Sequence, residues 1–588
     1  MKKLLDLLTE EMGKAFEKAG YAAELGKVTV SNRPDLCEYQ CNGAMAGAKK
    51  YHKAPIMIAN EVAEVLKEMP VFSQVDAVAP GFLNLKLSES YLSDYLKGMR
   101  TADKYGFEPS KGKEKVVIDY GGANVAKALH IGHIRSANIG ESVKRILRFA
   151  GDEVIGDAHL GDWGLQMGLV ICGLKERKPD LVYFDENYQG DYEDAPGVTI
   201  EELCEIYPAS SAKSKEDPEY KAKAMEDTKK LQDGVRGYRA LWQKMMDTST
   251  ADLKKNYGDL NVDFDLWNGE SSVHDMIPDM VQYMKDGGWA HISEGALVVD
   301  VAEETDTKKV PPCMILKSDG ASLYNTTDLA TIQQRMRDFD PDRIIYIVDK
   351  RQDLYFDQVF RCARKTKLVK PETKLTFIGF GTMNGSDGKP YKSRDGRVMK
   401  LGTLLDETKA EMFKKIKEGR PVSDEEAKQI ADVVALSALK YGDLSNQASK
   451  DYVFDVDRFT SFEGDTGPYI LYTIVRIKSI LAKYVENGGD YSAAKLGEAK
   501  NEFEKALQME IAQFGSVMDS AVTELAPHKI CGYIYDVANA FNKFYHETQI
   551  LSEADADRKA NLIALLVLTR DILETSIDLL GFEAPERM

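Results

Sequence analysis

The sequence has few cysteines, no long hydrophobic run and no excess of positive charge. Its seven cysteines are scattered over 588 residues without a Cys-x-x-Cys pair, which argues against a disulfide framework and indicates reduced thiols. No apolar stretch has the length of a membrane span. Residues 1–20 alternate leucine with charged residues and predict an amphipathic surface helix, not a targeting peptide. We therefore expect a cytoplasmic protein without a membrane partner.

A tightly bound metal is not expected either. The closest cysteine pair, Cys37 and Cys41, would need two further ligands, and only His52 follows nearby. The net charge of −18 also argues against nucleic-acid binding at first sight, because nucleic-acid-binding domains usually present a basic surface. Net charge is an average over the chain, however, and only the local field over a contact face matters. A nucleic-acid partner would therefore require a basic face on an acidic protein.

The chain is too long for one hydrophobic core, and its pattern changes twice. Residues 1–110 predict a small α+β module with helices at 2–19, 56–68 and 90–100 and a strand at 82–87. Residues 111–422 alternate strands with helical stretches, which favours a mostly parallel sheet. Its expected strands are 116–120, 153–157, 296–301, 313–316, 343–348 and 375–380.

Two further segments complete this division. Residues 176–225 are polar and acidic and interrupt the α/β pattern, so we expect an insertion carried on the surface. Residues 423–588 lose the strand pattern and predict an all-α bundle. The expected helices of the bundle are 424–445, 466–486, 494–521, 528–550 and 556–580.

One short motif is the best candidate for chemistry. His130-Ile131-Gly132-His133 follows an apolar run, residues 116–118, that predicts a buried strand. A helix is predicted directly after the motif and is expected to end near Gly151. A strand, a tight turn and a helix N-terminus together make a place to hold phosphates. Gly132 would allow close approach of a nucleotide, and the imidazoles would donate to phosphate oxygens; the alternatives are structural histidines or a zinc site.

A second candidate is a basic loop after a predicted strand. Lys389-Pro390-Tyr391-Lys392-Ser393 follows the strand at 375–380 and the turn at 384–385. A lysine here could neutralise oxygens that gain charge during phosphoryl or nucleotidyl transfer. The alternative is a solvated charged loop.

Polar side chains at strand ends form the third set. Asp119 and Asn124 follow the first strand of the α/β region, and Gln352 follows the strand at 343–348. Tyr324 and Asp328 are four residues apart at the start of a predicted helix and so share one face. Taken alone, Asp328 could simply be a first-turn acid that complements the helix dipole.

Together these segments resemble the arginyl-tRNA synthetases, a family of class I aminoacyl-tRNA synthetases. Residues 130–133 match the His-Ile-Gly-His signature of the class, and residues 389–393 occupy the place of its Lys-Met-Ser-Lys-Ser loop. The arginine-specific likeness lies in the surroundings and extends over nearly the whole chain. It comprises Asn124–Lys127, His159–Gly164, Ser318–Gly320, Tyr324 with Asp328, Arg351-Gln352, Thr466–Tyr469 and Pro585–Met588. The chain departs from the family at Gly122-Ala123, Tyr391 and Asn561.

The resemblance implies three domains and a two-step reaction. Residues 1–110 would be an additional tRNA-contacting domain, 111–422 a Rossmann-like catalytic domain and 423–588 a helical anticodon-binding domain. L-arginine would react with ATP, accompanied by Mg²⁺, to give arginyl-adenylate. The arginyl group would then pass to the terminal adenosine of tRNA(Arg), at the 2′-hydroxyl in this class. The family needs bound tRNA for activation, and we carry this over as an expectation together with a monomeric state.

The resemblance also implies roles for individual residues. The catalytic set would be His130, Gly132, His133, Lys389 and Lys392. ATP would contact His130, Gly132, His133, Lys127, Lys392 and Ser393. The arginine guanidinium would contact Tyr324 and Asp328, while Asp119, Asn124 and Gln352 would surround the amino-acid head group. The tRNA would contact Tyr469, Tyr472 and Arg476.

Three other functions stay open on the sequence. A class I synthetase for cysteine or glutamate would give no reason for Tyr324 and Asp328 together. A non-catalytic tRNA-binding paralogue would not need the histidines and Lys392. A small-molecule nucleotidyltransferase would have no use for the large C-terminal helical region.

Overall fold

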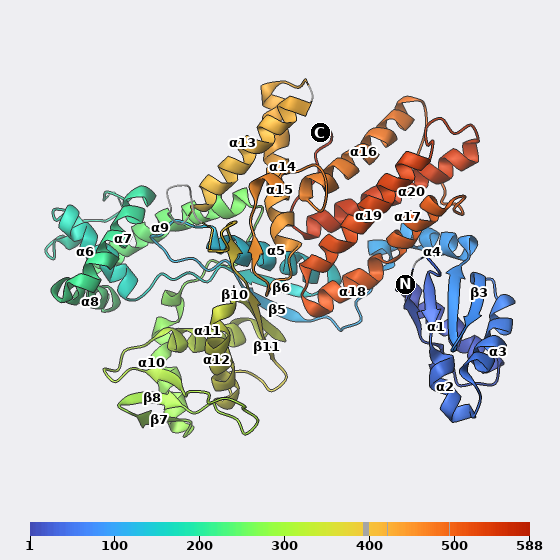
Figure 1. Ribbon diagram of the computed structural model, residues 1–588. Helices are drawn as coiled ribbons and strands as arrows, with labels where there is room; N and C mark the ends of the chain where they lie inside the picture. Colours follow the sequence, from blue (N-terminus) through green and yellow to red (C-terminus); the bar gives the residue numbers. More distant parts are fainter. Residues whose placement is uncertain (34, 194, 392–398, 420, 493) are drawn as a thin grey trace. The chain divides into compact units, whose positions relative to one another are not determined.

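The computed structural model describes residues 1–588 except 34, 194, 392–398, 420 and 493 (Figure 1). The chain forms two compact units, each assembled from segments that are distant in the sequence. Met1–Gly112, Ser461–Leu579 and Glu583–Met588 form the first unit, and Lys113–Thr460 with Leu580–Phe582 forms the second. Among the described residues, no helix has both the length and the apolar character needed to cross a membrane.

A four-stranded sheet organises the second unit. Its order is β11-β10-β5-β6, and every neighbouring pair is parallel. The strands are β5 (Lys115–Asp119), β6 (Glu153–Asp157), β10 (Arg343–Asp349) and β11 (Lys374–Phe380). The chain adds β6 on one side of β5 and later adds β10 and β11 on the other, so the strand order reverses between β5 and β10. Open α/β sheets bind their ligands at the carboxyl edge beside such a reversal.

Helices cover this sheet on both faces (Figure 1). α5 (Gly132–Ala150) connects β5 to β6, packs against β5, β6 and β10, and is itself covered by α14 (Asp424–Leu444). The C-cap Gly151, with φ of 98°, ends α5 where the sequence predicted its end, because glycine adopts the left-handed conformation without steric cost.

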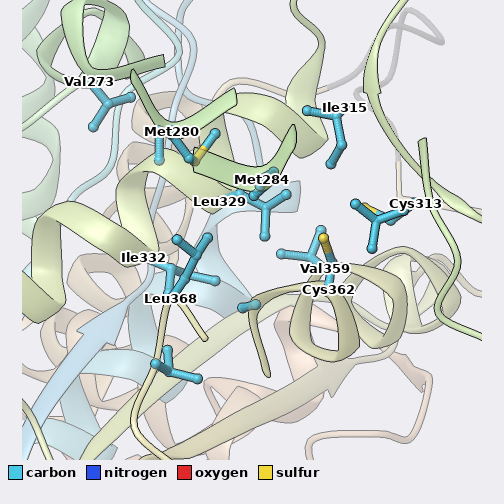
Figure 2. Close-up of a cluster of buried hydrophobic side chains, with 14 of the residues drawn as sticks. Val273, Met280, Met284, Cys313, Ile315, Leu329, Ile332, Val359, Cys362 and Leu368 are labelled. Atoms are coloured by element: carbon cyan, nitrogen blue, oxygen red, sulfur yellow. The ribbon is translucent and has the colours of Figure 1, made fainter. Parts of the chain in front are cut away.

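A hydrophobic cluster joins the other face of the sheet to α11 (Tyr324–Phe339) and α12 (Asp353–Lys365). Figure 2 shows Leu329 and Ile332 of α11 in one cluster with Val359 and Cys362 of α12. The sheet side chains of the cluster include Val117 and Tyr346. Burial of one face of α11 against the sheet leaves its other positions free to carry polar groups at the carboxyl edge.

The remaining elements of the second unit are short or helical. They are α6 (Leu165–Arg177), η3 (Val182–Phe184), α7 (Ile200–Glu216), α8 (Pro218–Gln232), α9 (Arg236–Asp259), η4 (Glu270–Met276), α10 (Ile277–Asp286), β7 (Ala290–Ser293), β8 (Ala296–Val299), β9 (Cys313–Leu316), η5 (Lys350–Gln352), β12 (Met383–Asn384), α13 (Leu401–Gly419), β13 (Tyr452–Val453) and α15 (Val456–Phe459).

Two strands were predicted in the wrong sheet. The segments 296–301 and 313–316 do form strands, β8 and β9, but they belong to a separate antiparallel sheet of order β7-β8-β9. Glu294 and Gly295 both have positive φ and make the two-residue turn that folds β7 back on β8. A short apolar run does not show whether its partner is parallel or antiparallel, so the pattern alone could not separate the two sheets.

The insertion is helical and has a small core of its own. Residues 176–225 include α7 and most of α8, which both pack against α6. Leu169 and Cys172 of α6 are buried with Tyr220 and Ala224 of α8. The segment is therefore a helical addition that packs on α6.

The first unit contains an α+β module and a helical bundle. The module has a four-stranded antiparallel sheet of order β1-β2-β4-β3. Its elements are α1 (Leu4–Lys18), η1 (Ala23–Gly26), β1 (Val28–Val30), β2 (Tyr39–Cys41), α2 (Gly43–Tyr51), α3 (Pro55–Lys67), β3 (Phe72–Val78), β4 (Phe82–Leu87), α4 (Glu89–Thr101) and η2 (Asp103–Gly106). The bundle consists of α16 (Gly467–Glu486), α17 (Glu502–Ala512), α18 (Phe514–Glu524), α19 (Pro527–Glu547) and α20 (Ala556–Leu579).

One helix of the bundle differs from its prediction. The run expected at 494–521 is two helices, α17 and α18, and begins only at Glu502. The Asn501 side chain accepts a hydrogen bond from the backbone N–H of Glu504 at 2.8 Å and so caps the N-terminus of α17. Asparagine is favoured at helix N-caps and disfavoured inside helices. Asn501 therefore marked the start of α17 in the sequence.

Candidate active site

The His-x-Gly-His turn lies at the carboxyl end of β5, beside the reversal of strand order. Nδ1 of His130 accepts a hydrogen bond from the backbone N–H of Gly132 at 3.0 Å, so the neutral ring carries its proton on Nε2. The two imidazole rings lie 4.1 Å apart between centroids. A Cβ on Gly132 would lie 2.7 Å from the His130 ring, so a larger residue at this position would displace the ring.

Both histidines are held neutral. Burial lowers the pKa of His133 to about 3, and burial together with the positive charge of Lys127 lowers the pKa of His130. A neutral imidazole still donates one hydrogen bond through its N–H. The turn can therefore orient phosphate oxygens, and any positive charge must come from lysines.

The segments that flank the two signature loops pair directly with each other. The backbone N–H of Ile131 donates to the carbonyl of Met399 at 3.1 Å, and that of Leu401 donates to the carbonyl of Leu129 at 3.1 Å. His130 and Lys400 thus form an antiparallel bridge. Residues 399–401 are therefore fastened by backbone hydrogen bonds to the start of the histidine turn.

The second signature loop itself is only partly described. Lys392 and Ser393 lie outside the described residues. Lys389 is exposed, and its carbonyl accepts from the backbone N–H of Gly385 at 2.8 Å in a turn after β12. The Tyr391 N–H donates to the carbonyl of Met383 at 3.1 Å, which closes this hairpin just before the undescribed residues.

A second pair of loops meets at the ends of β5 and β6. The Val125 N–H donates to the Gly161 carbonyl at 3.0 Å, and the Gly161 N–H donates to the Ala123 carbonyl at 3.0 Å. A Cβ on Gly161 would lie 2.2 Å from Oδ1 of Asn124, so glycine is required for Asn124 to keep this position. Asn124 is exposed, as is Gln352, which follows β10 at the other side of the strand-order reversal.

Carboxylates accumulate at the same edge, on α11 and η4. Burial raises the pKa of Asp328 to about 6, and burial together with the charges of Asp328 and Asp162 raises the pKa of Glu270 to about 8. Both side chains are half-buried, and the Tyr355 hydroxyl donates to Asp328. Tyr324, one turn before Asp328, is 72% exposed. Two half-buried carboxyl groups, of which Asp328 raises the pKa of Glu270, form a site that favours a bound cation.

Asp119 has a partner within the protein. Its Oδ2 accepts a hydrogen bond from Nη2 of Arg335 at 2.7 Å, and the same nitrogen donates to Oδ2 of Asp157 at 2.7 Å. Asp119 was predicted to contact the substrate head group, and one of its oxygens is already engaged by this buried arginine.

The sequence did not single out Glu270, Tyr355 or Arg335. Glu270 lies in a short 3-10 segment without periodicity, and its importance arises only from its proximity to Asp328 in the folded chain. Tyr355 and Arg335 occupy ordinary helix positions on α12 and α11. Only the helical spacing of Arg335, seven residues after Asp328, could have placed it on the same face.

The predicted tRNA contacts gather on the surface of the bundle. The Arg476 guanidinium lies 4.7 Å from the ring of Tyr472 and 5.0 Å from that of Tyr545, and donates to Oδ1 of Asn542 at 2.6 Å. Tyr472 is 41% exposed. The Tyr469 hydroxyl donates to Oδ1 of Asn539 at 2.8 Å and accepts from Nδ2 of Asn542 at 2.9 Å. Helices α16 and α19 thus present an aromatic and cationic face.

Family models match the chain over almost its entire length. Residues 99–456 match the catalytic domain of "tRNA synthetases class I (R)", and residues 470–588 match the DALR anticodon binding domain. Residues 2–87 match the arginyl tRNA synthetase N terminal domain. The parallel sheet, the paired signature segments and these matches define a class I aminoacyl-tRNA synthetase.

Comparison with individual proteins identifies the family within this class. The chain is 59% identical to the arginine–tRNA ligase of Agathobacter rectalis and 52% identical to that of Alkaliphilus oremlandii, with 100% of each chain covered in both comparisons. Among solved structures, its fold is similar to arginyl-tRNA synthetase from Plasmodium falciparum, with a TM-score of 0.79 at 23% identity and full coverage of both chains. The chain belongs to the arginyl-tRNA synthetase family.

Proposed function

We propose that the chain joins L-arginine to the terminal adenosine of tRNA(Arg) at the cost of ATP, in two steps. First, an oxygen of the arginine carboxylate attacks the α-phosphorus of MgATP. The bond to the β-phosphate oxygen breaks, and pyrophosphate leaves with its electron pair. Then the 2′-hydroxyl oxygen of the terminal ribose attacks the carbonyl carbon of arginyl-adenylate, AMP leaves and the hydroxyl proton is released.

The observation that carries the arginine specificity is the pair Asp328 and Glu270. A planar guanidinium can donate two parallel hydrogen bonds to a carboxylate, whereas other side chains cannot match this fork. Burial raises the pKa of both carboxyl groups, and the charge of Asp328 raises that of Glu270 further, so a bound cation would be favourable here. Bound arginine would supply that cation, and Tyr324 would cover the guanidinium from the solvent side.

The ATP side is assigned to the two signature loops. His130 and His133 would donate to phosphate oxygens at the N-terminus of α5, and Gly132 would let the nucleotide approach the backbone. Lys127, Lys389 and Lys392 would neutralise the charge that grows on the leaving pyrophosphate, and Ser393 would accompany Lys392. The backbone pairing of the flanking segments supports a common site for the two loops.

The amino-acid head group is assigned to the loops after β5 and β10. Asn124 and Gln352 are exposed at the carboxyl edge of the sheet and can hydrogen-bond the ammonium and carboxylate groups of arginine. Asp119 would act beside them through the oxygen that Arg335 leaves open. With this assignment, the attacking carboxylate would lie between the guanidinium site and the histidine turn.

The first unit is assigned to tRNA. Tyr469, Tyr472 and Arg476 would bind the anticodon loop, because unpaired bases are recognised by stacking on aromatic and guanidinium planes. The module within residues 1–110 would make further contacts with the tRNA. Local charge on these faces, rather than the overall charge of −18, would decide the attraction.

The test is ATP–pyrophosphate exchange with each of the standard amino acids, with and without total tRNA. We expect exchange with arginine alone, and we expect it to require tRNA. Exchange with cysteine or glutamate and none with arginine would overturn the assignment. Absence of exchange under every condition would instead support the non-catalytic paralogue.

A further inference from the structure

Arg335 is a buried cation that the reaction does not use directly. Its side chain is 2% exposed, and it lies on α11 two turns after Asp328. Nη2 donates to the carboxylates of Asp119 and Asp157, both at 2.7 Å. The guanidinium also lies 5.4 Å from the ring centroid of Tyr346.

These three partners lie side by side on neighbouring strands. Asp119 of β5 is in register with Asp157 of β6 and with Tyr346 of β10. Side chains in register on adjacent parallel strands are about 4.8 Å apart, so the two carboxylates would repel each other in the absence of Arg335. One guanidinium therefore holds three strands at a single level of the sheet, at the edge where the substrate is expected.

The ion pairs of Arg335 with Asp119 and Asp157 would contribute little if their only role were to stabilise the fold. Nε of Arg335 and Oδ1 of Asp157 are buried and have no hydrogen-bond partner in the described part of the chain. Buried polar atoms without partners are destabilising, and a buried ion pair is often replaced by apolar residues without loss of stability. A role in the site accounts for its presence better than a role in the core.

We infer that Arg335 is a positioning residue for arginine recognition. It fastens α11 to the carboxyl ends of β5 and β6 and offsets one of the two negative charges there. The carboxylate of Asp328, on the same helix, is then the group that binds the guanidinium of the substrate. Without Arg335, the guanidinium of the substrate L-arginine would also be attracted to Asp119 and Asp157. In that position the carboxylate of the substrate could not reach ATP. This inference rests on the proposed function.

A pH effect follows from the same geometry. The charged and titratable groups around Asp328 come from four other segments and from its own helix. They are Tyr355 of α12, His159 after β6, Asp119 of β5, Glu270 of η4 and Arg335 of α11. The positive charge of Arg335 lowers the pKa of Asp328, so its removal raises that pKa and extends the pH range in which Asp328 is protonated.

The experiment compares three variants in ATP–pyrophosphate exchange with saturating tRNA. Arg335→Met removes the charge, Arg335→Lys keeps the charge without the fork, and Arg335→Met with Asp157→Asn removes the cation and one carboxylate together. Arg337→Met is the matched control, because Arg337 lies on the same helix and pairs at the surface with Asp338.

We expect Arg335→Met to raise the KM for arginine about 30-fold or more, while the KM for ATP changes less than about twofold. The acid limb of kcat/KM for arginine should move to higher pH in Arg335→Met and stay in place in Arg335→Lys. The double variant should recover part of the lost affinity for arginine. It also provides a measurement if Arg335→Met alone does not fold.

Equal increases in both KM values, or an acid limb that stays in place in Arg335→Met and in the double variant, would overturn the inference. Failure of the wild-type protein to catalyse exchange with arginine would overturn the proposed function instead.

Discussion

Replacement of Asp328 by asparagine tests the recognition of arginine most specifically. The change keeps the shape of the side chain and an oxygen for the Tyr355 hydroxyl, and removes only the charge. Because the pKa of Glu270 is raised to about 8, Asp328 carries most of the negative charge of the pair at pH 7. Two unit charges about 4 Å apart interact by roughly 4 kcal/mol at an effective dielectric constant of about 20. We therefore expect kcat/KM for arginine to fall about 1,000-fold.

The assay is ATP–pyrophosphate exchange with arginine and with citrulline, whose neutral urea group has the shape of guanidinium. In Asp328→Asn the preference for arginine over citrulline should collapse, and the KM for ATP should change less than about threefold. Asp338→Asn, at the exposed end of the same helix, is the control and should have no effect. A retained preference, or equal losses for arginine and ATP, would refute the reasoning and indicate a role in helix stability.

Four further predictions concern the site and the bundle. Arginine binding at pH 7 should release up to about one proton, because the bound guanidinium lowers the raised pKa of Glu270. Calorimetry in two buffers of different ionisation enthalpy measures this release. Glu270→Gln should abolish it. Since the pKa values of Glu270 and Asp328 lie above their ordinary values in the folded state, these two groups bind more protons in the unliganded protein than in the unfolded chain between about pH 4 and 8. Their contribution to the free energy of unfolding should therefore fall as pH rises through that window, so Glu270→Gln should become more stable relative to the wild type toward pH 8, as urea denaturation would show. Gly161→Ala should raise the KM for arginine about 10-fold or more, because the new Cβ displaces Asn124; an unchanged KM would contradict the head-group assignment. Tyr472→Ala should raise the KM for tRNA about 10- to 100-fold with the KM for arginine unchanged, as expected for loss of one stacked base.

The histidine turn could be predicted because its information is local. An apolar strand, a His-x-Gly-His turn and an apolar helical face ending at Gly151 follow one another without interruption, and β5 and α5 form as expected. The pairing of Met399 with Ile131 is different, since it joins segments that are far apart in the sequence. Only the resemblance, and not the pattern, suggested that the two loops meet.

Only part of the proposed guanidinium site had a signal in the sequence. Tyr324 and Asp328 lie one turn apart on α11, so their helical spacing made them candidates, and their role stays a prediction. Glu270 comes from a separate 3-10 segment, and its pKa is raised by burial and then by the charges of Asp328 and Asp162, which lie near it in the folded chain. No pattern around Glu270 indicates that proximity.

The sheet assignment failed at β8 and β9 for a related reason. Both segments are short and apolar, as a parallel strand would be, but their partners are set by the turn at Glu294-Gly295 and by β7, which the sequence did not predict. Pairing between distant segments is a property of the whole fold.

The most direct test of the central claim is to identify which tRNA the protein charges, and with which amino acid. Total tRNA is incubated with the protein, ATP and all standard amino acids, and then treated with periodate, which spares only those 3′ ends that carry an amino acid. Sequencing of the protected tRNAs and analysis of the released amino acid should give tRNA(Arg) isoacceptors and arginine alone. Protection of any other tRNA in their place, or release of a different amino acid, would contradict the account.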